Sequence, residues 1–167
     1  ARRYRRPDGA SGHGGDPDGM RDRKGNVDLW FLEKLNAQPY FILPPPKSLG
    51  KEWVVEHVFP LLKNSELSTN DLLSTYCEHI AIQVGIATVG SKTKKLFITG
   101  GGTFNGYLIE RIRHYSIPEI IIPDVNTINY KEALIFAFLG VLRWRNEVNC
   151  LKSVTGAIRD SSGGAIY

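Results

Sequence analysis

Three consecutive glycines end a short run of strand-forming residues in the segment LFITGGGTFN, residues 96–105. Glycine takes positive φ freely and lets another group approach the main chain without an intervening Cβ. A helix predicted to begin near Asn105 would direct its unpaired amides and positive dipole end toward this turn, which favours an anionic or polar ligand. Gly100, Gly101, Gly102 and Asn105 are therefore the first candidate binding residues, and a nucleotide fits them well. A plain tight turn is the alternative.

The elements around the turn predict a βαβ unit. A strand over residues 96–99, a helix from about residue 105 to 115 and a strand over residues 119–122, closed by Pro123, follow one another. Their order predicts parallel strands with a right-handed crossover. Because two parallel strands are too few to be stable unaided, we expect an α/β fold that is part of a larger sheet, with further strands upstream of Ala1 or in a partner.

Several helices are predicted around this unit. Residues 51–63 have helical spacing, although Pro60 must end or kink the helix. A helix from Ser68 to about Thr88 is the best marked, since Asp71 stands at the capping-box position. Residues 130–144 are apolar on nearly every side, which predicts a central, buried helix. An earlier helix has one apolar face, made by Val27, Trp30, Phe31 and Leu35.

Composition indicates an ordinary globular chain. Its 167 residues are 42% hydrophobic and 23% charged, which predicts one compact domain in the cytoplasm and neither a membrane nor a disordered class. Most of the net charge of +4 lies in the first 25 residues, which hold seven Arg/Lys and four Asp. Residues 1–18 are predicted to be an unstructured basic Gly/Arg-rich tail, and no specific nucleic-acid binding is expected.

Metal and disulfide chemistry is not indicated. Cys77 and Cys150 lie far apart in the sequence and both are interpreted as small buried apolar residues. The four histidines, His13, His57, His79 and His114, have no metal-ligand spacing. We therefore predict no metal ligand and no histidine role.

Two nucleotide hypotheses compete for the glycine turn. A dinucleotide site needs G-x-G-x-x-G after the first strand and an acid after the second, and Gly100, Gly102 and Asp124 match in part. The sixth position is Asn105, however, and a missing third glycine disfavours the close packing that the dinucleotide motif serves. ATP is therefore the preferred ligand, with a dinucleotide as the alternative.

Motifs along most of the chain carry a family resemblance. The chain resembles the C-terminal lobe of the anhydro-N-acetylmuramic acid kinase family, within the superfamily of sugar kinases, actin and heat-shock chaperone ATPases. The matching stretches are DPDG at 16–19 with Gly25, PPKSLGKEW at 45–53, ITGGGTFN at 98–105, PD at 123–124, KEALIFAFLGVLR at 131–143 and SVTGA at 153–157.

The resemblance implies a partial ribonuclease-H-like, actin-like C-terminal lobe over residues 19–167. It implies a two-lobed enzyme that uses ATP and Mg²⁺ to open the 1,6-anhydro ring and phosphorylate O6, giving N-acetylmuramic acid 6-phosphate in peptidoglycan recycling. The glycine triplet and Asn105 then correspond to the adenosine motif, and Glu132 to an acid that orients water or sugar. A favourable charge at the positive helix end is the alternative for Glu132. Weaker candidates are Lys47, Ser48, Thr155 and Gly156, with an N-cap role as the alternative for Ser48.

The departures from the family predict what the chain lacks. Neither the N-terminal lobe, with its phosphate loop and general-base aspartate, nor the Phe-Asp-Thr-Gly-Pro segment has a counterpart, and Asp22 stands where the family has a small apolar residue. We expect the chain alone to be inactive and to form a homodimer or otherwise self-associate through the faces of the sheet that the missing part would cover. A non-enzymatic nucleotide-binding or assembly module is the alternative.

Overall fold

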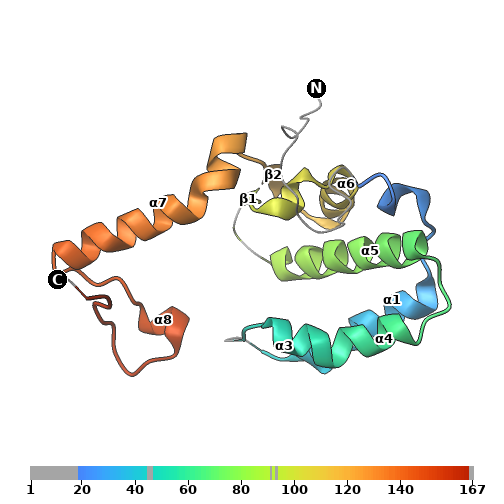
Figure 1. The fold of residues 1–167 in the computed structure, drawn as a ribbon, viewed down its shortest axis with the longest axis horizontal. Coiled ribbons are helices and arrows are strands. Elements are labelled where there is room, and N and C mark those ends of the chain that lie inside the picture. Colours follow the sequence, from blue (N-terminus) through green and yellow to red (C-terminus); the bar gives the residue numbers. More distant parts are fainter. Residues whose placement is uncertain (1–18, 45–46, 91, 93, 166–167) are drawn as a thin grey trace.

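The computed structural model describes residues 19–165 apart from residues 45–46, 91 and 93. The predicted basic tail and most of the DPDG stretch lie outside these residues. Figure 1 shows helix α5 between a layer of helices and the β1–α6–β2 unit, while α7 extends away from both. The helices are η1 (Asp22–Lys24), α1 (Leu29–Asn36), α2 (Pro39–Ile42), α3 (Lys51–Trp53), η2 (Val54–Val58), α4 (Phe59–Lys63), α5 (Thr69–Thr88), η3 (Gly101–Phe104), α6 (Gly106–Tyr115), α7 (Val125–Trp144) and α8 (Lys152–Thr155).

The predicted βαβ unit is confirmed. Strands β1 (Lys95–Phe97) and β2 (Glu119–Ile121) pair in parallel, with Leu96 opposite Ile120, and α6 connects them. Both strands end earlier than predicted, although the Ile98 amide still donates to the Ile121 carbonyl at 2.9 Å. The structure therefore has a mixed α/β architecture with a two-stranded sheet in the described residues.

Helix α5 joins two apolar clusters. Its N-terminal half covers Phe31, Leu35 and Val58 of the helical layer, while Ala81 packs on Ile109 and Ile112 of α6. The predicted start is confirmed, because the Ser68 hydroxyl accepts from the Asp71 amide at 3.2 Å. Burial on two sides makes α5 the scaffold that holds the βαβ unit against the rest of the fold (Figure 1).

Two details of the helical layer differ from the sequence prediction. Trp30 is 63% exposed and does not share the buried face of Phe31 and Leu35. The Lys34 ammonium lies 3.5 Å from the centre of its ring. The predicted helix over 51–63 is helical throughout but contains the π-helical segment η2 immediately before Pro60. A wider turn here accommodates a ring that lacks an N–H and would clash with the preceding turn.

Helix α7 is not the buried helix that its composition predicts. It begins at Val125, earlier than expected, and Ile128 is its one buried residue within the described part of the chain. Large apolar side chains along it are exposed, with Phe136 at 71%. The apolar pattern shows that this helix needs covering, but no other described element packs broadly against it. The C-terminal segment, predicted as turns, contains the short helix α8, which is drawn below α7 in Figure 1.

The two cysteines differ in burial. Cys77 is buried as predicted, whereas Cys150 is only half-buried because it lies in an isolated antiparallel bridge with Ser161 near the chain end. Among the described residues, none of the helices combines the length and the apolarity that crossing a membrane would require.

Candidate functional site

The glycine turn has one position that requires glycine and one that leaves open space. Gly100 has φ +97° and ψ 175°, a conformation that side chains with a Cβ rarely adopt. Its carbonyl accepts from the Thr103 amide at 3.0 Å and from the Thr103 hydroxyl at 2.6 Å, which closes the turn into η3. A Cβ placed on Gly101 would meet nothing within 4 Å. The backbone therefore explains Gly100, whereas Gly101 leaves room for a ligand to approach the main chain.

A polar cleft of about 270 Å³ lies beside this turn. One wall is the turn itself, and the other is the N-terminal part of α7. The lining residues are Gly100, Gly101, Phe104, Ile128, Asn129, Lys131 and Glu132. The Lys131 ammonium lies 3.9 Å from the position of a Cβ on Gly100, so a cation faces the turn. Such a cleft, with backbone amides and one ammonium group, suits a polar or anionic small ligand.

Glu132 lines the cleft, and its helix-dipole alternative loses support. Because α7 begins at Val125, Glu132 lies at the end of the second helical turn rather than in the first. The effect of the dipole on a side chain falls off within the first turn. Lys131 was missed by sequence reasoning, although it directly precedes Glu132 in the KEA sequence and is the one cation at this end of the predicted helix.

Gly102 and Asn105 do not line this cleft. Gly102 lies on the other side of the turn, in an apolar groove between β1, α5 and α6. Asn105 is the N-cap of α6, where its Oδ1 accepts from the Leu108 amide at 2.9 Å. Its Nδ2 donates to the Asp22 carboxylate, so both ends of the Asn105 amide have protein partners.

The weaker candidates lie away from the cleft. Lys47 donates through Nζ to the carbonyls of Tyr40 at 3.0 Å and Phe41 at 3.3 Å. The predicted N-cap role of Ser48 is wrong, because α3 begins at Lys51 with Gly50 at the N-cap position. Thr155 and Gly156 end α8, which is separate from the turn in Figure 1. Gly156 takes the left-handed conformation of a helix C-cap, and the Thr155 hydroxyl donates to the Leu151 carbonyl at 2.9 Å.

Asp124, which the dinucleotide hypothesis needs as a ribose acceptor, caps α7 instead. Its carboxylate accepts from the Asn126 amide at 2.9 Å, the Thr127 amide at 3.1 Å and the Thr127 hydroxyl at 2.7 Å. The Thr127 hydroxyl and these amides hold the pKa of the Asp124 carboxyl below its ordinary value. With these acceptors engaged in the first turn of α7, the structure gives the dinucleotide alternative little support.

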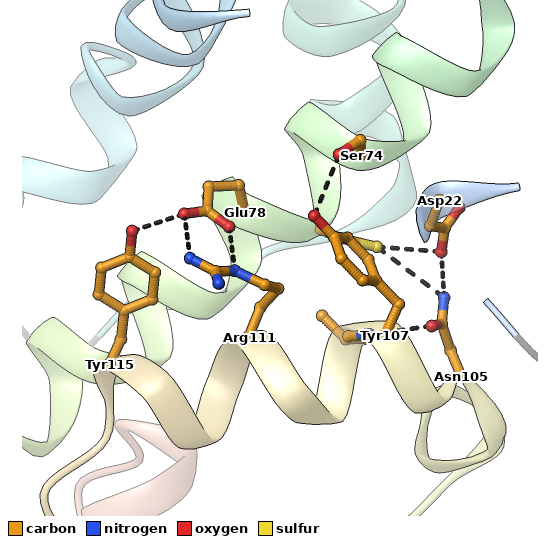
Figure 2. A network of polar contacts seen from close by, with 9 residues as sticks. Asp22, Ser74, Glu78, Asn105, Tyr107, Arg111 and Tyr115 are labelled. Atoms are coloured by element: carbon orange, nitrogen blue, oxygen red, sulfur yellow. Dashed lines mark hydrogen bonds and ion pairs between the residues drawn. The ribbon is translucent and has the colours of Figure 1, made fainter. Parts of the chain in front are cut away.

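A polar network joins α5 and α6 (Figure 2). Arg111 donates to the buried Glu78 carboxylate through Nε at 2.5 Å and Nη2 at 2.8 Å, and the Tyr115 hydroxyl donates to Glu78 at 2.5 Å. Burial alone would raise the pKa of Glu78, but the hydrogen bonds from Arg111 and Tyr115 outweigh it and hold this pKa below its ordinary value. The same contacts raise the pKa of Arg111. Sequence reasoning missed this pair, which local periodicity does not reveal.

The described residues contain no group of side chains arranged to bind a metal ion. Across residues 19–165, apart from the gaps at 45–46, 91 and 93, no three His, Cys, Asp or Glu side chains are grouped to hold a metal ion. His79 is buried and its ring Nδ1 lies 2.7 Å from the Asn36 Oδ1, while His57 stacks on Trp53. Both contacts are structural, and neither histidine lines the cleft.

The fold and the cleft define a mixed α/β protein in which a glycine turn and the N-terminal part of a helix line a polar cleft. Comparison with known proteins makes the assignment more specific. The chain belongs to the anhydro-N-acetylmuramic acid kinase family, whose sequence profile matches residues 9–167.

Curated relatives agree with this assignment. Anhydro-N-acetylmuramic acid kinase from Sulfurovum sp. (strain NBC37-1) is 33% identical over 157 residues, which are 91% of this chain and 43% of the relative. The enzyme of the same name from Hydrogenovibrio crunogenus is 35% identical over 158 residues, with the same two shares. That from Vibrio parahaemolyticus is 30% identical over 165 residues, 94% of this chain and 44% of the relative. The chain thus spans less than half the length of these relatives.

Proposed function

We propose that this chain is the adenosine-binding, C-terminal part of an ATP-dependent anhydro-N-acetylmuramic acid kinase, with the architecture of an actin-like, ribonuclease-H-like C-terminal lobe. The complete enzyme would open the 1,6-anhydro ring and phosphorylate O6 of the sugar in peptidoglycan recycling in the cytoplasm. Family membership and the names of the relatives support the reaction class. The parallel βαβ unit supports the architecture.

The cleft between the glycine turn and α7 is the observation that carries this proposal. Gly101 offers backbone that a ligand can approach, because no protein atom lies where its Cβ would be. Lys131 contributes a positive charge to the same cleft. A nucleoside with an attached phosphate combines a flat apolar face, hydrogen-bonding edges and negative charge, and this wall complements the last two.

Asn105 contributes to the proposed site through the turn. The carbonyl of Gly102 accepts a hydrogen bond from the backbone N–H of Asn105 at 3.1 Å, while the Asn105 side chain caps α6. Asn105 therefore sets where the turn ends and the helix begins. Gly102 packs on the apolar side of the turn, so Gly100 and Gly101 form the ligand-facing part of the motif.

Glu132 is the proposed acid at the reacting end of the site. Its exposed carboxylate lines the cleft and can accept a hydrogen bond from a water molecule or a sugar hydroxyl there. Its role is to orient that group, and we assign no general base to this chain. ATP, when bound, supplies the phosphoryl group for transfer. We expect the phosphate and Mg²⁺ side of the site from the part of the relatives' length that this chain does not cover, and we therefore propose that the chain alone is inactive.

Isothermal titration with ATP tests the proposal through Gly101→Val. The described neighbourhood of Gly101 leaves room for a side chain, so the variant should fold, but its branched side chain would occupy the ligand's approach. We expect saturable binding by the parent chain and at least about tenfold weaker binding by the variant, a change of 1.4 kcal/mol. Gly140→Ala on α7, another glycine with open space around its Cβ position, is the matched control and should bind like the parent.

Two results would count against the proposal. Equal ATP affinity of the parent and the Gly101→Val variant would show that ATP does not bind at this turn. Turnover of ATP on anhydro-N-acetylmuramic acid by the 167-residue chain would contradict its proposed inactivity. ATP binding without turnover is expected both for an inactive lobe of a kinase and for a non-enzymatic nucleotide-binding module. An activity assay on a longer protein distinguishes these two.

Self-association through the faces of the sheet remains a prediction, and a different surface, on α7, also favours association. The large side chains along α7, among them Leu134, Phe136 and Phe138, have no extensive packing partner in the described residues. Exposed apolar patches of this kind mark protein interfaces. We propose that a second protein surface covers α7, either another copy of this chain or further polypeptide of the complete enzyme.

A further inference from the structure

Asp22 is buried between η1, α5 and the start of α6, and we propose that it is a positioning residue for the glycine turn, acting through Asn105. Only 1% of Asp22 is exposed. Figure 2 shows its carboxylate directed toward the Asn105 side chain at the N-terminal end of α6. This inference rests on the proposed nucleotide site for its functional meaning, although the contacts themselves do not depend on a ligand.

One carboxylate oxygen of Asp22 serves two donors. Its Oδ2 accepts from the Asn105 Nδ2 and from the Cys77 thiol, with the Cys77 Sγ at 3.2 Å. Because the Asn105 Nδ2 is held there, its Oδ1 is left to cap the Leu108 amide at 2.9 Å. Asp22 thus selects the orientation of the Asn105 amide that satisfies an otherwise unpaired donor of α6.

The connection continues into the glycine turn. The backbone N–H of Asn105 donates to the Gly102 carbonyl at 3.1 Å, and the backbone N–H of Thr103 donates to the Gly100 carbonyl at 3.0 Å. Asn105 therefore makes the last backbone hydrogen bond of the glycine turn and also caps the N-terminus of α6. A change in its side-chain orientation would move the junction that places Gly100 and Gly101 beside the cleft.

The backbone at Gly19, three residues before Asp22, lies close to the Asn105 side chain. A Cβ on Gly19 would lie 2.3 Å from the Asn105 Oδ1, so the backbone of this segment passes directly over the amide. Arg23, which directly follows Asp22, forms an ion pair with Glu110 on α6 at 2.6 Å. The segment from Gly19 to Lys24 therefore contacts α6 through the buried Asp22 at the start of the helix. It also contacts α6 through the exposed Arg23, which pairs with Glu110 and lies over the Tyr107 ring.

The inference is that Asp22 matters as a hydrogen-bond acceptor. Asp22→Asn keeps an acceptor oxygen for Asn105. Asp22→Ala removes it and deprives the buried Cys77 thiol and the half-buried Asn105 Nδ2 of their shared acceptor. Arg23→Ala is the matched control, because it removes the contacts of Arg23 with Glu110 and with the Tyr107 ring on the same helix without touching Asn105.

Amide hydrogen exchange, measured by NMR on the 167-residue chain without nucleotide, tests the inference. Exchange of the Leu108 amide reports the Asn105 cap directly. We expect Asp22→Ala to accelerate it about tenfold relative to amides in the middle of α5. Asp22→Asn should stay within about threefold of the parent and Arg23→Ala within about twofold, since an exposed ion pair contributes little. An unchanged Leu108 amide in Asp22→Ala would overturn the inference, as would equal acceleration in all three variants.

A second variant keeps the test decisive if Asp22→Ala does not fold. Asn105→Ser retains an N-cap hydroxyl for α6 but is too short to cap the helix and reach Asp22 together. In this background, the chain with Asp22 and the chain with Asp22→Asn should have the same Leu108 exchange rate, because the link that Asp22→Asn modifies is gone. Different rates would show that Asp22 acts by another route.

ATP titration of the same variants separates this inference from the proposed function. If the parent binds ATP, the affinity should fall about tenfold in Asp22→Ala and be restored to within about threefold in Asp22→Asn. If the parent binds no ATP, the proposed function fails while the exchange data still decide whether Asp22 positions the turn. An ATP affinity unaffected by Asp22→Ala, in a parent that binds, would contradict the positioning role.

Discussion

Arg111→Met is expected to destabilise the fold because it leaves a buried carboxylate without its counter-ion. Glu78 is 5% exposed and receives two hydrogen bonds from Arg111, at 2.5 and 2.8 Å. Methionine retains much of the apolar packing of the arginine stem but supplies no charge and no donor. The variant therefore isolates the electrostatic contribution of Arg111 to the contact between α5 and α6.

The expected loss of stability follows from how deeply each partner of the Glu78–Arg111 ion pair is buried. Removing one partner of a fully buried ion pair costs about 3–5 kcal/mol. The Arg111 side chain is 25% exposed, and Tyr115 still donates to Glu78 after the substitution, so we expect a loss of about 2 kcal/mol at pH 7. With a urea m-value of about 2 kcal/mol/M, the midpoint of unfolding should fall by about 1 M.

The loss should depend on pH. In the parent chain the pKa of Glu78 is lowered, so its contribution to the free energy of unfolding is present above the unfolded pKa and is lost as pH falls through the folded value. In Arg111→Met, burial is less opposed and raises this pKa, so the folded state accepts a proton more readily at low pH. The difference between the two chains should therefore be largest near pH 7 and smaller near pH 4.

Urea unfolding followed by circular dichroism, at pH 7 and pH 4, measures both effects. Arg23→Met is the control on the same helix surface, because the Arg23–Glu110 pair is more than half exposed and should contribute less than about 1 kcal/mol. A loss below about 0.5 kcal/mol for Arg111→Met at pH 7, or an equal loss at both pH values, would refute this reasoning.

Two further predictions concern pH and assembly. Burial lowers the pKa of His79 to about 4, so the unfolded chain takes up a proton first and stability should decline as pH falls from about 6.5 to 4, by up to about 1.4 kcal/mol per unit; His79→Gln should flatten this decline in urea midpoints, and an unchanged slope would contradict it. Sedimentation velocity should show a mass that rises with concentration, reduced by Phe136→Lys but not by Asn126→Lys at the polar start of the same helix; a monomer at every concentration would contradict self-association.

Local signals predicted the elements that local interactions determine. Ser68 with Asp71 marked the start of α5, and the change from strand pattern to glycine to amphipathic pattern marked the βαβ unit. The start of α7 was predicted too late because its apolar pattern begins downstream of the cap, although an Asp such as Asp124 before a helical segment is a readable N-cap signal. That error also made the helix dipole a better explanation for Glu132 than the structure allows.

Contacts between distant residues could not be read from the sequence. Glu78 and Arg111 are 33 positions apart, and Asp22 and Asn105 are 83 apart. Periodicity reports which side chains are apolar, but it does not report which buried charges pair or which surfaces meet. For the same reason, the apolar pattern of α7 predicted that the helix needs covering without indicating what covers it.

Amide chemical shifts of the isotope-labelled chain during titration with ATP test the nucleotide site most directly. The Gly100, Gly101 and Lys131 amides should shift along one binding curve, because they line the two walls of the cleft. The Gly156 amide, at the end of α8, should stay in place. Saturable shifts that leave Gly100 and Gly101 unchanged, or no shifts at all with millimolar ATP, would contradict an adenosine site at the glycine turn.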